Sequence, residues 1–181
     1  MQTVLIRQAQ PEDSASITRV VNQAYRPEPG KEGWTHEASL VTGARVTLEQ
    51  VNVAIQNSVV LVAVIEHSVQ GCIRIEVDGQ SAHIGMLAVN PSLQNSGIGK
   101  RLLSEAETFA VRHLDANEAV LTVIAVRKEL LDFYQRCGYR ETGSFSSFPV
   151  DAGVGIPCQE AMMLTILRKD LAGRAERDAC A

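Results

Sequence analysis

Several features that would classify this 181-residue sequence at once are scarce or missing. Its four cysteines form no C-x-x-C pair and its four histidines show no ligand spacing, so we predict neither a disulfide framework nor a metal site. No apolar run approaches the roughly 20 residues that span a bilayer, and no signal-peptide core follows the N-terminus. These absences predict a cytoplasmic protein with free, mostly buried thiols and no membrane partner.

A strong charge of one sign is also absent. Seventeen basic and twenty-one acidic residues give a formal net charge of −4, which disfavours a nucleic-acid partner. Hydrophobic residues make up 45% and charged residues 21%, as in a globular protein with a sizeable core. We assign residues 1–171 to a single domain and expect the small, polar residues 172–181 to form a disordered tail.

Apolar residues alternate between the spacing of strands and that of helices, which predicts an α/β domain with a mixed sheet. Pro11 and the acids after it open the first helix, whose apolar stripe reaches Tyr25. Thr47 and Gln50 form a capping box for the second helix, and Asp78-Gly79 indicates a hairpin. The other helices are expected at 97–113 and 129–136, and the strands at 4–7, 59–65, 71–77, 82–89, 119–126, 139–144 and 161–168.

A turn with two glycines, between a buried strand and the next helix, is the most informative segment. Gly97 and Gly99 leave the first helix amides open to an anion, since those amides have no partner inside the helix and carry the positive end of its dipole. A nucleotide P-loop is excluded because Gln94 stands where its first glycine belongs and Arg101 follows the lysine. A dinucleotide fingerprint is excluded because Leu102 replaces its third glycine.

The remaining pattern, Gln94-x-x-Gly97-x-Gly99, resembles the acetyl-CoA-binding motif of the GCN5-related N-acetyltransferases, the GNAT family. A second segment, 133–139, fits the family's F-Y-x-x-x-G-[FY] motif, and the segment 34–38 is similar to a W-T-x-E-A loop of one subgroup. The order of expected elements matches the family along nearly the whole chain. The resemblance implies the GNAT fold, with a mixed, mostly antiparallel central sheet that is splayed at the acetyl-CoA site and flanked by helices.

The same resemblance implies where acetyl-CoA, the expected cosubstrate, binds. Main-chain groups of the strand before the turn would contact the acetyl carbonyl and pantetheine, and the amides of the turn would hold the pyrophosphate. Arg127 stands where many members carry an asparagine that bonds the pantetheine arm, so either a backbone group replaces that contact or the guanidinium reaches the cofactor. The cofactor-binding residues implied in this way are Leu87, Ala88, Val89, Gln94, Asn95, Ser96, Gly97, Ile98, Gly99, Lys100, Arg127, Phe133 and Tyr134.

Two side chains are implied in catalysis. Tyr134 stands where the family's tyrosine protonates the leaving CoA thiolate, a role that suits a phenol protonated at neutral pH; the alternative is an ordinary half-buried helix tyrosine. His83 lies where some members place the base that deprotonates the amine. Alternatively, His83 is an ordinary solvated histidine at the end of a strand. Gly85 offers no base where other members place a glutamate. Glu76 and Glu37 are lesser candidates for that base.

The loop expected at 26–42 would line the acceptor pocket. Trp34 beside Glu37 would hold a cationic amine by stacking and charge, with Glu76 as a further substrate-binding candidate; alternatively Trp34 fills the core beneath the loop. No cysteine has a base partner, so we predict direct acetyl transfer in a ternary complex. We expect the acceptor to be a primary amine of a small molecule, and a homodimer is a further hypothesis.

Three other functions stay open at this stage. The chain could bind acetyl-CoA as a non-catalytic sensor or interaction module, since no carboxylate base stands at Gly85. It could acetylate protein N-termini or lysines, for which an open groove would be needed. A toxin that acetylates charged tRNA would need a basic face beside the cleft.

Overall fold

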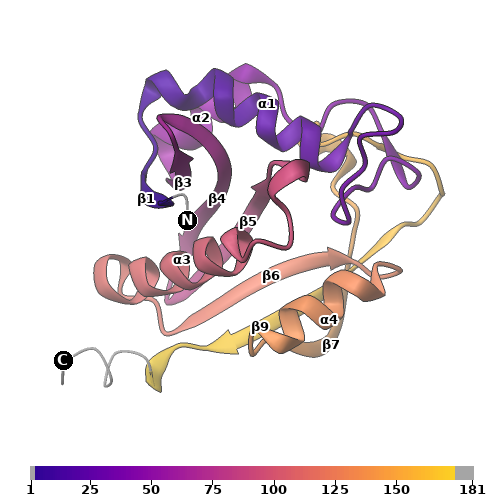
Figure 1. Cartoon of the computed structure of the whole chain (residues 1–181). Helices are drawn as coiled ribbons and strands as arrows, with labels where there is room; N and C mark the ends of the chain where they lie inside the picture. The colour runs from indigo at the N-terminus through magenta and orange to yellow at the C-terminus, as the bar shows by residue number, and fades with distance from the viewer. Residues whose placement is uncertain (1–2, 174–181) are drawn as a thin grey trace.

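The computed structural model describes residues 3–173, which form a seven-stranded sheet with helices on both faces (Figure 1). Every neighbouring pair of strands is antiparallel except β5 and β6, which are parallel. This confirms the expected mixed, mostly antiparallel sheet. In spatial order the strands are β1 (Leu5–Gln8), β3 (Val59–Ile65), β4 (Ser68–Asp78), β5 (Ser81–Val89), β6 (Glu118–Ile124), β9 (Met163–Asp170) and β7 (Arg140–Ser147).

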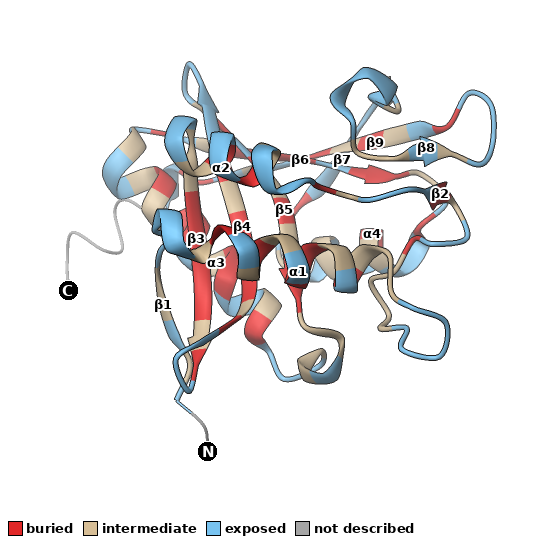
Figure 2. Cartoon of the chain, turned by 90° about the horizontal axis from the view of Figure 1, so that it is seen from above, coloured by how far each residue is buried: buried red, intermediate tan, exposed pale blue. Residues whose placement is uncertain are grey.

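Two apolar clusters hold the helices to opposite faces of this sheet. Helices α1 (Ser14–Tyr25) and α2 (Leu48–Asn57) pack on one face, and α3 (Ile98–Leu114) and α4 (Lys128–Arg136) pack on the other. Side chains alternate along a strand, so in β3 the neighbours Val60 and Leu61 contribute to different clusters. The buried residues accordingly concentrate in the central strands (Figure 2).

Local signals in the sequence account for several element ends. The Thr47 hydroxyl accepts a hydrogen bond from the Gln50 amide at 3.1 Å, and the Gln50 side chain accepts one from the Thr47 amide at 2.8 Å. This capping box confirms the predicted start of α2. The predicted hairpin is also present, with Asp78 paired to Ser81 across the turn.

Some boundaries differ from the expectations. Strand β6 ends at Ile124 rather than at residue 126, and β7 continues to Ser147 rather than to residue 144. A two-stranded sheet of β2 (Val41–Thr42) and β8 (Ile156–Pro157) joins two segments that were expected to be loops. Three short 3-10 turns complete the described elements, η1 (Pro11–Asp13), η2 (Pro91–Leu93) and η3 (Val150–Ala152).

The central feature of the sheet is the separation of β5 from β6. Within the described residues their pairing runs only from Ser81 to His83, although both strands continue well beyond that point (Figure 1). A bulge in β5 accompanies the separation: Met86 has φ of +52°, and the register against β4 shifts beside it. Ile84 packs in the apolar cluster on the α3 side of the sheet, whereas Met86 packs in the cluster on the side of α1 and α2. Residues two apart in a regular strand would point to the same side, so the bulge turns the side chains after it to the opposite face of the sheet. The expected splay is confirmed.

Three further expectations concern the whole chain. No helix among the described residues is long and apolar enough to cross a membrane. Of the cysteines in residues 3–173, all free, Cys72 is buried, Cys137 is half-buried and Cys158 is exposed, so the expectation of mostly buried thiols was too broad. The tail expected at 172–181 lies, from residue 174 onward, outside the described residues, and Leu171 before it is buried.

Candidate active site at the splayed strands

A cleft of about 740 Å³ opens where β5 and β6 separate. Its floor is formed by the diverging strands, and α1, α2, α4 and the segment after β7 form its walls. The sequence-predicted residues that line it are His83, Glu76, Glu37, Leu87, Arg127 and Tyr134. The glycine turn, Trp34 and Phe133 are not among the lining residues. The cleft therefore unites the proposed catalytic groups, with the proposed pyrophosphate turn outside it.

Tyr134 extends from α4 into this cleft. Its ring meets the Phe133 and Tyr139 rings edge-on, with centroids 5.2 and 5.9 Å apart, which fixes its orientation. Its hydroxyl has no hydrogen-bond partner among residues 3–173 and is not sealed from the cleft. Burial raises the pKa of Tyr134 above its ordinary value, so the phenol keeps its proton throughout the physiological range. The site thus presents a protonated, unpaired donor.

Tyr25, at the end of α1, is a site residue that sequence reasoning missed. Its hydroxyl donates a hydrogen bond to the Leu87 carbonyl at 2.9 Å. Burial raises the pKa of Tyr25 to about 12, so this hydrogen bond persists at neutral pH. The contact holds the part of β5 that follows the bulge, where the strand has no partner on its β6 side.

Glu76 on β4 and His83 on β5 lie opposite each other, at the point where β5 begins to separate from β6. Each is the other's register partner, and His83 is also the last residue of β5 that pairs with β6. Glu76 forms an ion pair with Arg74 on its own strand. A Cβ placed at Gly85 would meet nothing within 4 Å, so β5 has open space at this position.

The glycine turn has the open amides that its sequence predicts. Gly97 is the N-cap of α3 with φ of +85°, a left-handed conformation that favours glycine. The first hydrogen bond of the helix runs from the Arg101 amide to the Gly97 carbonyl at 3.0 Å, so the amides of Ile98, Gly99 and Lys100 have no acceptor within the helix. A Cβ at Gly99 would meet only the Val89 side chain, at an ordinary 3.7 Å. The fold therefore does not require glycine at 99, whereas a bound anion would.

The residues before the two glycines are held by local backbone geometry and by side-chain hydrogen bonds. Asn95 has φ of +65°, and the Ser96 hydroxyl donates to the Leu93 carbonyl at 2.5 Å. Leu87, Ala88 and Val89 lie in the part of β5 that has no partner on its β6 side, although Ala88 and Val89 still pair with β4. The Gln94 side chain faces inward, donating to the Val89 carbonyl at 3.2 Å and to the Thr35 hydroxyl at 2.7 Å.

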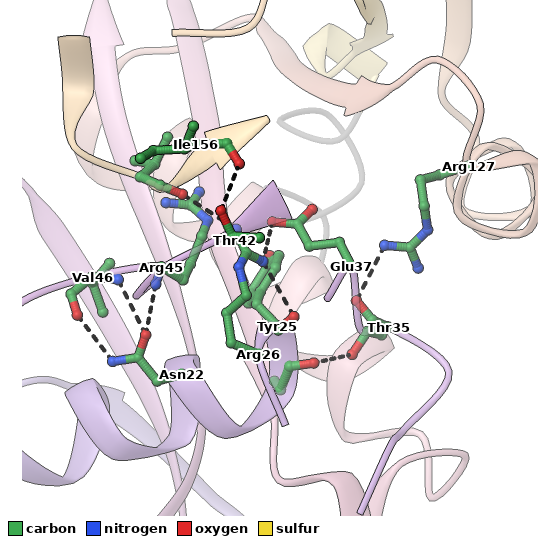
Figure 3. A network of polar contacts seen from close by, with 12 residues as sticks. Asn22, Tyr25, Arg26, Thr35, Glu37, Thr42, Arg45, Val46, Arg127 and Ile156 are labelled. Carbon is green, nitrogen blue, oxygen red and sulfur yellow. Dashed lines mark hydrogen bonds and ion pairs between the residues drawn. The ribbon is translucent and has the colours of Figure 1, made fainter. Parts of the chain in front are cut away.

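Gln94 thus fastens the 26–42 loop to the turn. A Cβ on Gly33 would lie 2.3 Å from the Gln94 amide oxygen, so the loop approaches this closely because residue 33 is glycine. Arg127 fastens the loop from the other side, donating to the Trp34 carbonyl at 3.1 Å and to the Thr35 carbonyl at 3.2 Å. Figure 3 shows the second of these contacts. Its Nε also pairs with Glu129, and the residue is only 5% exposed. The partners of Arg127 in this structure are therefore protein groups.

Two loop residues expected to bind substrate have protein partners as well. Glu37 forms an ion pair with Arg26 at 2.7 Å, and both side chains are 9% exposed (Figure 3). The Trp34 ring, which is half-buried, packs against Phe133 with centroids 5.5 Å apart. Glu37 still lines the cleft, whereas Trp34 does not. Both contacts fix the loop over α4 and the end of α1.

Comparisons with known proteins agree with this geometry. A family profile for the acetyltransferase (GNAT) domain matches residues 28–148. Among solved structures, PaiA N-acetyltransferase from Thermoplasma acidophilum, in complex with coenzyme A, is 18% identical with a TM-score of 0.73, covering 93% of this chain and 99% of that one. A putative acetyltransferase from Salmonella typhimurium with its cofactor acetyl-CoA is 20% identical with a TM-score of 0.70, covering 93% and 94%.

A third structure, an acetyltransferase of the GNAT family from Streptococcus pneumoniae, is 18% identical with a TM-score of 0.68, covering 93% of this chain and 99% of that one. A search of curated proteins finds no significant match. The profile covers more than half of the 181 residues, and the folds agree over nearly the whole chain. The chain belongs to the GNAT family of acetyltransferases.

Proposed function

We propose that this N-acetyltransferase moves the acetyl group of its cosubstrate, acetyl-CoA, directly to the primary amine of a small molecule while both are bound. The observation that carries the proposal is the cleft at the splay, which Tyr134, with no hydrogen-bond partner for its hydroxyl among the described residues, lines together with residues 83–87 of β5. The open amides of α3 lie beyond the end of the same strand. These parts could hold a long donor that has phosphates at one end and a thioester at the other.

The residues present fit the donor. The amides of Ile98, Gly99 and Lys100 would bind the pyrophosphate, since they lack helix acceptors and carry the positive end of the α3 dipole. On the side of β5 that β6 leaves free, main-chain groups of Leu87, Ala88 and Val89 would bind the pantetheine arm and the acetyl oxygen as an added strand does, other than the Leu87 and Val89 carbonyls, which accept from Tyr25 and Gln94. Phe133 would make an apolar contact with the donor. Arg127 would act by holding the loop, since its guanidinium donates to the Trp34 and Thr35 carbonyls.

The donor supplies an activated acetyl group, whose carbonyl carbon forms a bond to the amine nitrogen as its bond to sulfur breaks. A β5 amide directed at the acetyl oxygen would stabilise the negative charge that develops there. Tyr134 would stabilise the departing sulfur. Because burial raises the Tyr134 pKa above that of an ordinary thiol, the neutral phenol stabilises the leaving thiolate by donating a hydrogen bond to it. The proton that neutralises the sulfur is balanced by the proton that the attacking nitrogen loses as it becomes an amide, so any proton passed on by Tyr134 is replaced.

The attacking amine must first lose a proton, because an ammonium group has no lone pair. His83 at the fork of β5 and β6 is the proposed base, and Glu76 opposite it would orient the imidazole or accept the proton in its place. Trp34 and Glu37 would shape the acceptor side through the loop they stabilise. An acyl-enzyme route has no support in the described part of the chain, where no cysteine lines the cleft and burial raises the pKa values of Cys72 and Cys137.

Release of CoA thiol in the presence of an amine panel tests this proposal. Double-reciprocal plots at several acetyl-CoA concentrations should intersect, because a ternary complex forms; parallel lines would indicate a covalent acyl-enzyme. Tight binding of acetyl-CoA without turnover of any amine would favour a sensor instead. Light scattering tests the homodimer proposal, for which the edge strand β7 with its exposed Phe145 is the expected contact.

A further inference from the structure

The charges that line the cleft are nearly all neutralised by neighbours, with Arg45 as the exception among its cations. In residues 3–173, three arginine side chains line the cleft. Arg74 pairs with Glu76, and Arg127 pairs with Glu129. The Arg45 guanidinium forms no ion pair and no hydrogen bond with any described residue. It is therefore available to an anionic ligand.

Arg45 is also held in position. Its amide donates to the Asn22 side chain at 2.7 Å, and that side chain in turn donates to the Val46 carbonyl at 2.9 Å (Figure 3). Its guanidinium lies over the Tyr25 ring, 5.2 Å from the centroid, and the residue is half-buried. An arginine restrained by stacking loses less freedom when it forms a bidentate contact. These contacts make Arg45 a prearranged binding group rather than a mobile surface charge.

The Tyr25 ring connects this guanidinium with the reaction centre. One face of the ring carries Arg45, while its hydroxyl bonds to the Leu87 carbonyl of β5. Leu87 is one of the residues proposed to contact the acetyl end of the donor. The guanidinium and the acetyl position are thus separated by about one aromatic side chain. An acceptor of a few carbon atoms could reach both.

The carboxylates of the cleft do not offer an equivalent position for a second cation. Glu37 is occupied by Arg26 and Glu76 by Arg74. Glu49, the remaining glutamate of the lining, is exposed on the first turn of α2 and makes no ion pair with a described residue. A half-buried charge interacts more strongly with a ligand than an exposed one does.

We propose that Arg45 selects the acceptor, and that the acceptor is a small primary amine carrying a carboxylate or another anionic group. The inference rests on the proposed N-acetyltransferase function. The guanidinium would hold the anionic group through two parallel N–H donors, while the amine at the other end approaches the acetyl carbon. Arg45 would act in positioning the acceptor, and would not exchange a proton with it.

A matched set of short amines tests the inference. β-Alanine and its carboxamide differ only in the charge of the distal group, 2-aminoethylphosphonate offers a phosphonate in its place, and 1,3-diaminopropane offers a second cation. We expect kcat/KM for β-alanine or the phosphonate to exceed that of the carboxamide by roughly 10- to 100-fold, as for hydrogen bonds to charged groups. Whichever anion gives the larger value identifies the group that Arg45 binds.

Variants assign the preference to a residue. Arg45→Gln should reduce the ratio of kcat/KM for the anionic amine to kcat/KM for the carboxamide toward one. Arg45→Lys, which keeps the positive charge, should retain part of that preference. Arg19→Gln, on the exposed side of α1, is the matched control and should leave the ratio unchanged. Each variant should bind acetyl-CoA with the affinity of the parent chain and unfold at a similar melting temperature, which would show that it folds.

Three outcomes would contradict the inference. Equal turnover of β-alanine, the phosphonate and the carboxamide would overturn it while leaving the N-acetyltransferase proposal intact. A preference for 1,3-diaminopropane that Glu49→Gln removes would overturn it in favour of a dicationic acceptor. Turnover of none of these amines, or of any other amine, by a protein that binds acetyl-CoA would overturn both proposals.

Discussion

The Tyr25 hydroxyl donates a 2.9 Å hydrogen bond to the Leu87 carbonyl and so ties the end of α1 to the bulged half of β5. Tyr25→Phe removes the donor and leaves a carbonyl without its partner. We expect a loss of about 1 kcal/mol in the free energy of unfolding, as for a typical intramolecular hydrogen bond, measured by urea titration. Turnover should also fall, because β5 is proposed to orient the acetyl group. An unchanged kcat would show that β5 holds its shape without this contact.

The same residue predicts a dependence of stability on alkaline pH. Folding raises the pKa of Tyr25 to about 12, above the ordinary value near 10. The folded state therefore holds this proton more tightly than the unfolded state. The resulting contribution to stability is fully present below pH 10 and is lost as pH rises toward 12. Urea titrations between pH 9 and 12 should show a smaller loss for Tyr25→Phe than for the parent chain.

Tyr134→Phe tests the proposed acid. Loss of a positioned proton donor typically lowers the rate by about 10²- to 10⁴-fold, and we expect kcat to fall within that range while acetyl-CoA affinity changes little. The same substitution at Tyr139 is the control, because that hydroxyl is buried outside the cleft. Full activity in Tyr134→Phe would assign the residue to packing alone.

Gly99→Ala should affect stability and donor binding in opposite directions. Alanine in a helix is favoured over glycine by roughly 0.5–1 kcal/mol, and the new Cβ meets only Val89 at 3.7 Å, so the melting temperature should rise. The same methyl group would block the pyrophosphate, and we expect at least a tenfold weaker binding of acetyl-CoA by calorimetry. Acetyl-pantetheine, which lacks the pyrophosphate, is the matched ligand whose binding should not change. Equal losses for both ligands would place the pyrophosphate elsewhere.

The features that could be predicted from the sequence are those with a local cause. The capping box at Thr47, the hairpin after Asp78 and the open amides after Gly97 each depend on residues only a few positions apart. The separation of β5 from β6 has no local signal in either strand. It was expected because two motifs resembled a family with a known sheet, and the profile match to the GNAT domain supports that resemblance.

Long-range pairing limited the prediction of the site. Tyr25 was placed correctly on the apolar stripe of α1, but its hydroxyl bonds to a carbonyl 62 positions away. Glu37 and Trp34 were recognised as a charge and a ring in a loop, whereas Arg26 and Phe133 determine what they contact. The β2–β8 pair has two residues in each strand, too short for any periodicity to show. The tertiary partners, not the residue types, carried the missing information.

The ion pair of Glu37 with Arg26 predicts a loss of stability rather than a loss of substrate binding. Glu37→Gln would leave the Arg26 guanidinium, 9% exposed, without its counter-charge. Removing one partner of a buried pair costs about 3–5 kcal/mol, so the melting temperature should fall strongly. Replacing both partners together with apolar residues should recover much of that loss, because no buried charge then remains unpaired. Glu49→Gln is the exposed control in the same cleft and should leave the melting temperature nearly unchanged. A rise in the acceptor KM at unchanged stability would instead return Glu37 to the role of a direct ligand for the amine.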